Sequence, residues 1–96
     1  MVAPLHEPYS PGEAKRLIGR ILEAGDVRFS QHALDEMAKD ALDTVDCTNV
    51  LRGGVVEPGE WENRSWRYHV RTARMCVVVA FRSTTALVVV TAWRLR

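Results

Sequence analysis

The sequence predicts an α+β domain in which two or three N-terminal helices pack on a twisted antiparallel sheet of three to four strands. In the first half, apolar residues recur at the spacing of amphipathic helices, whereas beyond residue 54 the period changes to two and β-branched residues dominate. The 96 residues suit a single domain, 1–96. We expect a helical half over 11–53, an antiparallel sheet over 54–96, and a disordered arm over 1–9.

The first helix is predicted from about Pro11 to Ala24. Ser10 is a preferred capping residue, and Pro11 stands at the first helical position, where its missing N–H does no harm. Glu13 completes a capping box, and Gly25 is a natural terminator.

Two further helices are predicted before the sheet. The second begins after Ser30, carries His32 in its first turn, and holds an apolar stripe that extends to Leu42. The third is short, begins after the capping residue Asp43, and ends at the Gly53-Gly54 pair.

Three strands carry the sheet signal. Residues 64–71 alternate between polar and apolar side chains, as a strand with one buried face does. The runs Met75–Phe81 and Ala86–Trp93 are apolar on both faces and are separated by a loop of hairpin length. We therefore expect these two runs to be central strands covered by the helices.

Charge is divided between the halves of the chain. Residues 1–50 hold five basic and nine acidic residues, for a net charge of −4, whereas residues 51–96 hold eight arginines and three glutamates, for a net charge of +5. Arginine fits phosphate or carboxylate in two-point geometry, so an anionic partner is one explanation of the basic half. The other is that these arginines neutralise the acidic half within the fold.

Several kinds of chemistry lack support in the sequence. Its histidines and cysteines show no metal-ligand spacing, and it has no glycine-rich nucleotide loop, so neither a metal nor another cofactor is predicted. We interpret Cys47 and Cys76 as buried, reduced thiols. The longest apolar run is too short to span a bilayer, and the first residues lack a secretory signal pattern, so we expect no membrane partner and a cytoplasmic location.

One strand offers a group of candidate catalytic residues. Alternation places Arg67, His69 and Arg71 on one face, where they could follow a nucleic-acid backbone. Cleavage of RNA without a metal needs a base, an acid and cations that stabilise the charge developing on the phosphoryl oxygens. A solvated outer face of the sheet is the competing explanation.

His32 is a second candidate catalytic residue. Glu36 lies one helical turn further on, so its carboxylate could orient the imidazole for acid–base chemistry. The same pair could equally be a surface contact with no catalytic role.

These residues also carry a resemblance to a known family. The segment Phe29-Ser30-Gln31-His32-Ala33 with Met37, the segment Val50–Gly54 and the final strand Val90-Thr91-Ala92-Trp93 resemble a small bacterial domain family of unknown function. That family is similar in layout to the RelE, HigB, MqsR and BrnT toxins of bacterial toxin–antitoxin modules, which are compact ribonucleases. The resemblance covers roughly Val27 to Arg96.

The resemblance implies a RelE-like fold and a metal-independent endoribonuclease toxin whose partners are RNA and a cognate antitoxin protein. His32 matches the family's histidine at the helix start, and Thr91 matches the threonine of its last strand. We expect five side chains to contact RNA beside the catalytic group: Arg64, Tyr68, Thr91, Trp93 and Arg94.

A non-catalytic function is the alternative. The arginine-rich sheet face and the tryptophans Trp61, Trp66 and Trp93 could form the interface of a protein-binding or inhibitor module on the same fold, because these residue types are enriched at interface hot spots. An exposed edge strand could also pair with a second copy, which would give a homodimer.

Overall fold

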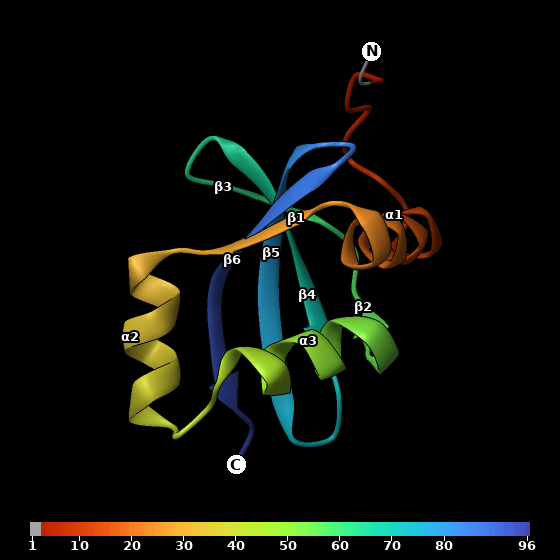
Figure 1. Cartoon of the computed structure of the whole chain (residues 1–96). Coiled ribbons are helices and arrows are strands. Elements are labelled where there is room, and N and C mark those ends of the chain that lie inside the picture. The colour runs from red at the N-terminus through yellow and green to blue at the C-terminus, as the bar shows by residue number, and fades with distance from the viewer. Residues whose placement is uncertain (1–2) are drawn as a thin grey trace.

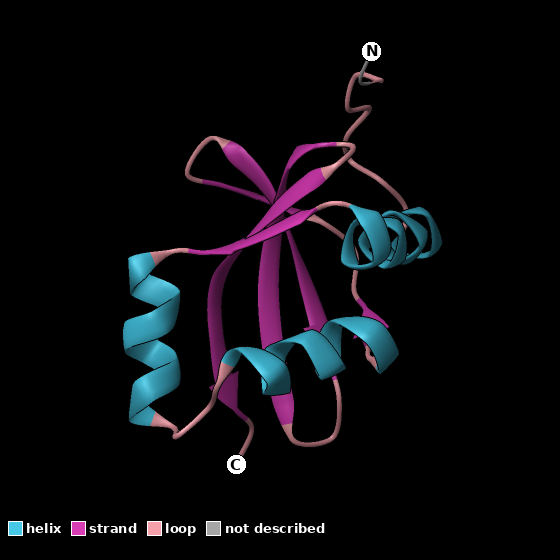
Figure 2. Cartoon of the chain, viewed as in Figure 1, coloured by secondary structure: helices cyan, strands magenta, loops and turns pink. Residues whose placement is uncertain are grey.

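Three helices and six strands make up residues 3–96, which are the part of the chain that this computed structural model describes (Figures 1 and 2). The helices are α1 (Pro11–Ala24), α2 (Gln31–Lys39) and α3 (Thr44–Gly53). The strands are β1 (Asp26–Phe29), β2 (Val55–Val56), β3 (Glu60–Glu62), β4 (Ser65–Arg71), β5 (Met75–Ser83) and β6 (Ala86–Arg94).

The caps predicted for the three helices are confirmed. Ser10 forms a capping box with Glu13 at the start of α1, and Asp43 forms one with Asp46 at the start of α3. The side chain of Ser30 accepts a hydrogen bond from a backbone N–H in the first turn of α2. The second helix is shorter than its apolar stripe, because the chain turns at Ala41 with a left-handed φ of 54°.

The sheet is mixed, with the strand order β1-β6-β5-β4-β2, and β3 pairs with the other end of β4. The central hairpin of β5 and β6 is confirmed, but the expectation of an all-antiparallel sheet of three to four strands is wrong. Strand β1 lies inside the predicted helical half and pairs in parallel with β6, with Val27 opposite Leu87. Its four residues are too few to show a periodicity that stands out between two helices.

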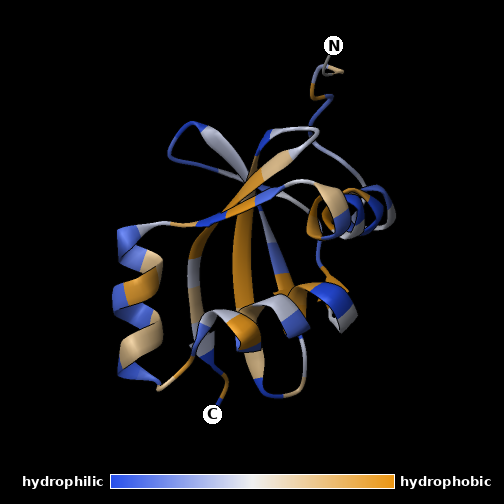
Figure 3. Cartoon of the chain, in the orientation of Figure 1, coloured by the Kyte–Doolittle hydropathy of each residue, from blue (hydrophilic) through white to orange (hydrophobic). Residues whose placement is uncertain are grey.

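The core lies between the sheet and the helices, and α2 contributes Ala33 and Met37 to it. Figure 1 shows α1 and α3 on one face of the sheet, with α2 beside β6. Apolar residues are concentrated on the central strands and on the helix faces turned toward them (Figure 3). The largest fully buried side chains of this core include Leu17, Ile18, Ile21, Leu51, Tyr68 and Leu87.

The outer edge of β6 is covered along its length by two different elements. Strand β1 pairs with its first half, and α2 packs beside its second half (Figure 1). Between them, the backbone N–H of Ser30 donates to the carbonyl of Val89 at 3.1 Å, and the Ser30 hydroxyl donates to the carbonyl of Val90 at 3.1 Å. Ser30 therefore fixes the start of α2 against the sheet.

Part of the segment 3–9, for which the sequence suggested a disordered arm, contacts the core, and residues 1–2 lie outside the described part of the chain. Leu5 and Tyr9 pack against the core, and the Tyr9 ring meets Phe81 edge-on with 5.8 Å between the ring centroids. The backbone N–H of Tyr9 donates to the Tyr68 hydroxyl at 3.0 Å. That hydroxyl donates in turn to the Glu7 carboxylate at 3.0 Å.

This contact predicts a pH dependence of folding stability. Burial raises the pKa of Glu7, and the hydrogen bond from Tyr68 opposes the rise only in part. Because the folded state then holds the Glu7 proton more tightly than the unfolded state, the contribution of Glu7 to the free energy of unfolding falls as pH rises through the raised pKa. Glu7→Gln keeps an acceptor for Tyr68 without a buried charge, so we expect it to raise the urea midpoint at pH 7.

The gain from Glu7→Gln should shrink as pH falls toward 4.5, where the wild-type carboxyl takes up its proton. Glu23→Gln is the matched control, because Glu23 is exposed on α1. Urea midpoints measured from pH 7 to pH 4.5 provide the test. If the urea midpoints of wild type and Glu7→Gln change in parallel with pH, Glu7 does not cause the predicted pH dependence of stability.

Candidate nucleic-acid interface

The candidate site lies on the face of the sheet opposite α1 and α3. Within residues 3–96, no helix packs over this face (Figure 1). The alternation of β4 places Arg67, His69 and Arg71 on it, as the sequence predicts, because Tyr68 and Val70 belong to the core on the other side. We call this surface the open face.

The middle of the open face is apolar and closed to solvent. Cys76, Val78 and Ala80 of β5 are between 0% and 3% exposed although no helix covers them. Larger side chains on the neighbouring strands shield them instead. His69 and Thr91 stand on either side of Val78 in the pairing register.

The register of the strands brings His69 close to Trp93 on the open face. Cys76 is paired with Arg71 on β4 and with Trp93 on β6, and the next pairing on this face joins Val78 to His69 and Thr91. The rings of His69 and Trp93 meet edge-on with 6.2 Å between their centroids. The side chains of His69, Thr91 and Trp93 are therefore half-buried. They shield the apolar residues of β5 and are themselves partly exposed to solvent.

The two arginines beside His69 differ in their contacts. The Nε of Arg71 donates to the Glu57 carboxylate at 2.8 Å, so a neighbouring anion already neutralises Arg71. Arg67 makes no ion pair among the described residues, and its Nε lies 3.5 Å from the Ser65 hydroxyl. Arg67 is therefore the member of the pair that is free to bind a phosphate.

Arg67 borders an open groove of about 530 Å³, which we call the histidine groove. His32 enters it from the first turn of α2, because Ser30 fixes that helix against β6. Arg82 reaches it from β5. The groove is lined by Ser30, His32, Glu62, Asn63, Ser65, Arg67, Ala80, Arg82, Val88 and Val90.

His32 is accessible and loosely partnered. Its side chain is 64% exposed, and its Nε2 lies 3.9 Å from the Glu36 carboxylate, which is too far for a hydrogen bond. Glu36 also pairs with Lys39 at 3.2 Å. A protonated His32 would be attracted by Glu36, while a neutral His32 keeps both ring nitrogens available to a ligand.

The structure corrects the expectation that Tyr68 contacts RNA. Its side chain is fully buried in the core, where its hydroxyl bonds to Tyr9 and Glu7, and burial raises the pKa of that hydroxyl. Arg94 also lies away from the groove, because its backbone N–H and its Nε both donate to Asp40, at 2.9 and 2.8 Å.

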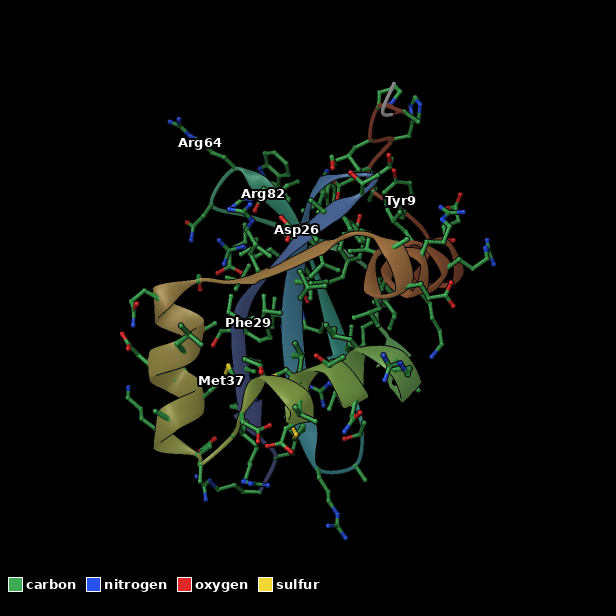
Figure 4. The ribbon with its side chains drawn as sticks, viewed as in Figure 1. Tyr9, Asp26, Phe29, Met37, Arg64 and Arg82 are labelled. Atoms are coloured by element: carbon green, nitrogen blue, oxygen red, sulfur yellow. The ribbon has the colours of Figure 1, made fainter. Side chains whose placement is uncertain are left out.

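Arg64 stands at the rim of the groove. It follows the groove residue Asn63 in the turn between β3 and β4, and both have left-handed φ values, of 65° and 49°. Figure 4 shows the Arg64 side chain directed away from the body of the domain. Arg64 could therefore contact a ligand that extends beyond the groove, but not one held inside it.

Sequence reasoning missed two charged residues of the groove. Arg82 follows Ala80 by two residues in a strand, and that spacing alone places it on the open face. Glu62 belongs to β3, whose three exposed residues give no apolar signal. Only the pairing of β3 with β4 brings Glu62 to the same wall as Ser65.

Other chemistries find little support among the described residues. Burial is the main cause that raises the pKa of both Cys47 and Cys76 to about 11, which disfavours a reactive thiolate. Over residues 3–96, no group of three histidine, cysteine, aspartate or glutamate side chains is placed to hold a metal ion. None of the described helices is long and apolar enough to cross a membrane.

In comparisons with known proteins, no family model, no curated protein and no solved structure matches this chain.

Proposed function

We propose that the chain cleaves RNA without a metal ion, at the histidine groove. One observation carries this proposal: α2 and the distant pair of consecutive strands β4 and β5 place His32, Arg67 and Arg82 around a single open groove. A histidine, the side chain that most often serves as a general acid or base, thus stands with two arginines, which can bind the oxygens of a phosphodiester.

The chemistry follows from these groups. His32 takes the proton of the ribose 2′-hydroxyl, and the resulting oxygen attacks the adjacent phosphorus. Arg67 and Arg82 stabilise the negative charge that develops on the phosphoryl oxygens. The bond from phosphorus to the 5′-oxygen then breaks, which leaves a 2′,3′-cyclic phosphate, and the departing oxygen takes a proton.

His69 is our candidate for the donor of that last proton. It lies on the same face of β4, two residues beyond Arg67. Its half-buried ring remains accessible from the open face beside Trp93. His69 does not line the histidine groove, so in either assignment of acid and base the substrate would extend from the groove along β4, past Arg67, to reach it.

The biological role that we propose is that of a toxin in a toxin–antitoxin module, neutralised by an antitoxin that covers the open face. This role is supported by the resemblance of the His32 and Thr91 segments to a small bacterial domain family whose layout is similar to that of the RelE-type toxins. Arg67 and Arg82, which form no ion pair with any of residues 3–96, would attract an acidic antitoxin as well as RNA.

Incubation of a long mixed-sequence RNA with the purified protein in excess EDTA tests the proposal. We expect cleavage by the wild type and none by the double variant His32→Gln/Arg67→Gln. The control His6→Gln/Arg74→Gln makes the same chemical changes at two exposed positions outside the groove, and should cleave normally. Intact RNA with folded wild type, or equal cleavage by both variants, would overturn the proposal.

A protein interface is the second candidate, favoured by the edge of the sheet beyond β4. Val55 on β2 and Trp61 on β3 are 70% and 61% exposed, and both strands pair with β4. A partner held by these apolar side chains should bind with little dependence on salt, whereas RNA binding should weaken steeply as salt rises.

A further inference from the structure

A second groove adjoins the histidine groove. It has a volume of about 520 Å³ and lies along β1 and β6, and we call it the edge groove. Its lining residues are Asp26, Arg28, Phe29, Arg82, Ala86, Leu87 and Val88. Arg82 and Val88 line both grooves, so a ligand can pass from one to the other without leaving the surface.

The pairing register explains why the two grooves are continuous. Val88 on β6 lies opposite Arg28 on β1 and opposite Ala80 on β5. The register of β4 with β5 continues this row to Arg67. Neighbouring strands are about 4.8 Å apart, so the backbones of Arg28 and Arg67 are separated by roughly 14 Å, with Val88 and Ala80 between them.

Arg82 belongs to the same face as this row. It lies two residues beyond Ala80 on β5 and is exposed. Figure 4 shows Arg82 near Asp26 of β1, in agreement with their shared place in the edge groove. Three arginines therefore surround Val88, one from each of β1, β4 and β5.

The charges in the edge groove favour an anion. The Nε of Arg28 donates to the Asp26 carboxylate at 2.7 Å, which uses one of the five N–H donors of that guanidinium. Asp26 is the single acidic residue of the groove lining, against Arg28 and Arg82. Because Asp26 holds Arg28 from one side, the terminal nitrogens of Arg28 remain available to a phosphate on the other.

We propose that the edge groove binds the neighbouring nucleotide of the RNA strand whose scissile phosphate lies in the histidine groove. Its phosphate lies between Arg28 and Arg82, and its base rests on the apolar side chain of Val88, which lies opposite Arg28 on the same face. This inference rests on the proposed function, because it assigns a second phosphate of the same substrate. It makes Arg28 a specificity residue that selects substrates with more than one phosphodiester.

Short oligonucleotides separate the two sites. A dinucleoside monophosphate has only the scissile phosphate, whereas trinucleotides extended on the 5′ or the 3′ side add one neighbouring phosphate. We expect wild type to cleave one of the two trinucleotides with a kcat/KM about tenfold above that of the dinucleotide, because a charge-assisted contact is gained. Arg28→Gln should lose this gain and leave cleavage of the dinucleotide unchanged.

Arg74→Gln is the matched control, because Arg74 is exposed in the turn between β4 and β5 and lines neither groove. Arg74→Gln should retain the gain from the third nucleotide. Arg82→Gln should slow cleavage of every length, because Arg82 borders both grooves. Equal kcat/KM for all lengths in wild type, or an equal loss at all lengths in Arg28→Gln, would overturn the inference while leaving the proposed function intact.

Binding supplies a readout that does not depend on cleavage. With 2′-O-methyl trinucleotides, which cannot form the cyclic phosphate, affinity falls with salt by a logarithmic slope of about 0.7 for each phosphate bound on a single strand. We expect Arg28→Gln to reduce the wild-type slope by about that amount. An unchanged slope would overturn the edge groove as a phosphate site, even if the protein proves to bind RNA without cleaving it.

Discussion

His32→Gln is expected to lower the kcat of RNA cleavage by about 100-fold or more. A positioned acid or base contributes roughly 10²- to 10⁴-fold to such reactions. Glutamine retains a polar side chain in the groove but cannot exchange a proton near neutral pH. The His32 side chain is 64% exposed and makes no hydrogen bond among the described residues, so we expect the variant to keep the stability of the wild type.

The pH profile of cleavage distinguishes proton transfer from mere binding. A reaction with one general base and one general acid has a bell-shaped pH profile, and loss of His32 should remove one of its limbs. His6→Gln is the control and should leave both limbs in place. A slower variant that keeps the full bell shape would show that His32 positions the substrate, and a variant with the wild-type rate would remove it from the mechanism.

Gly54→Ala is expected to destabilise the fold by about 3 kcal/mol or more. A Cβ atom at this position would lie 2.7 Å from the carbonyl oxygen of Val50 and 2.9 Å from that of Arg71. It would also lie 2.8 Å from a methyl group of Val70. Relief of these close contacts would require the end of α3 to move away from β4, because two of the three atoms that the Cβ would approach belong to the backbone.

Gly53→Ala is the control for this prediction, since no atom outside the helix's own backbone and its chain neighbours lies within 4 Å of an added Cβ there. As the last residue of α3, Gly53 should accept alanine with no loss and a gain of up to about 1 kcal/mol. Urea denaturation of both variants gives the comparison. Equal urea midpoints for the two variants would mean that α3 and β4 separate easily, and that the close approach at Gly54 does not affect the free energy of unfolding.

Local signals in the sequence predicted most of the fold. The caps at Ser10, Ser30 and Asp43 depend only on residues within one helical turn, and each of the three helices begins directly after its cap. The central hairpin carries long β-branched runs. Strand β1 was not predicted because its pairing with β6 joins residues about sixty positions apart, which no local pattern reports.

The candidate site was predictable only in part, because a strand pattern assigns faces but not neighbours. Alternation placed Arg67 and His69 on the open face, yet it could not show that Glu57 neutralises Arg71. The same alternation puts Tyr68 on the core side, although we expected Tyr68 to contact RNA. The meeting of His32 with Arg82 depends on the packing of α2 beside β6, which is a tertiary contact.

The late position of the central strands in the chain has a consequence for synthesis on the ribosome. Strands β5 and β6 are made after all three helices, and they form the middle of the sheet against which α1 and α3 bury their apolar faces. Until residues 75–94 have emerged, the nascent helices have no surface on which to pack, and isolated helices of 9 to 14 residues are marginal in water. The chain should therefore fold in one late step, and a protein truncated before β6 should remain unfolded and sensitive to proteases.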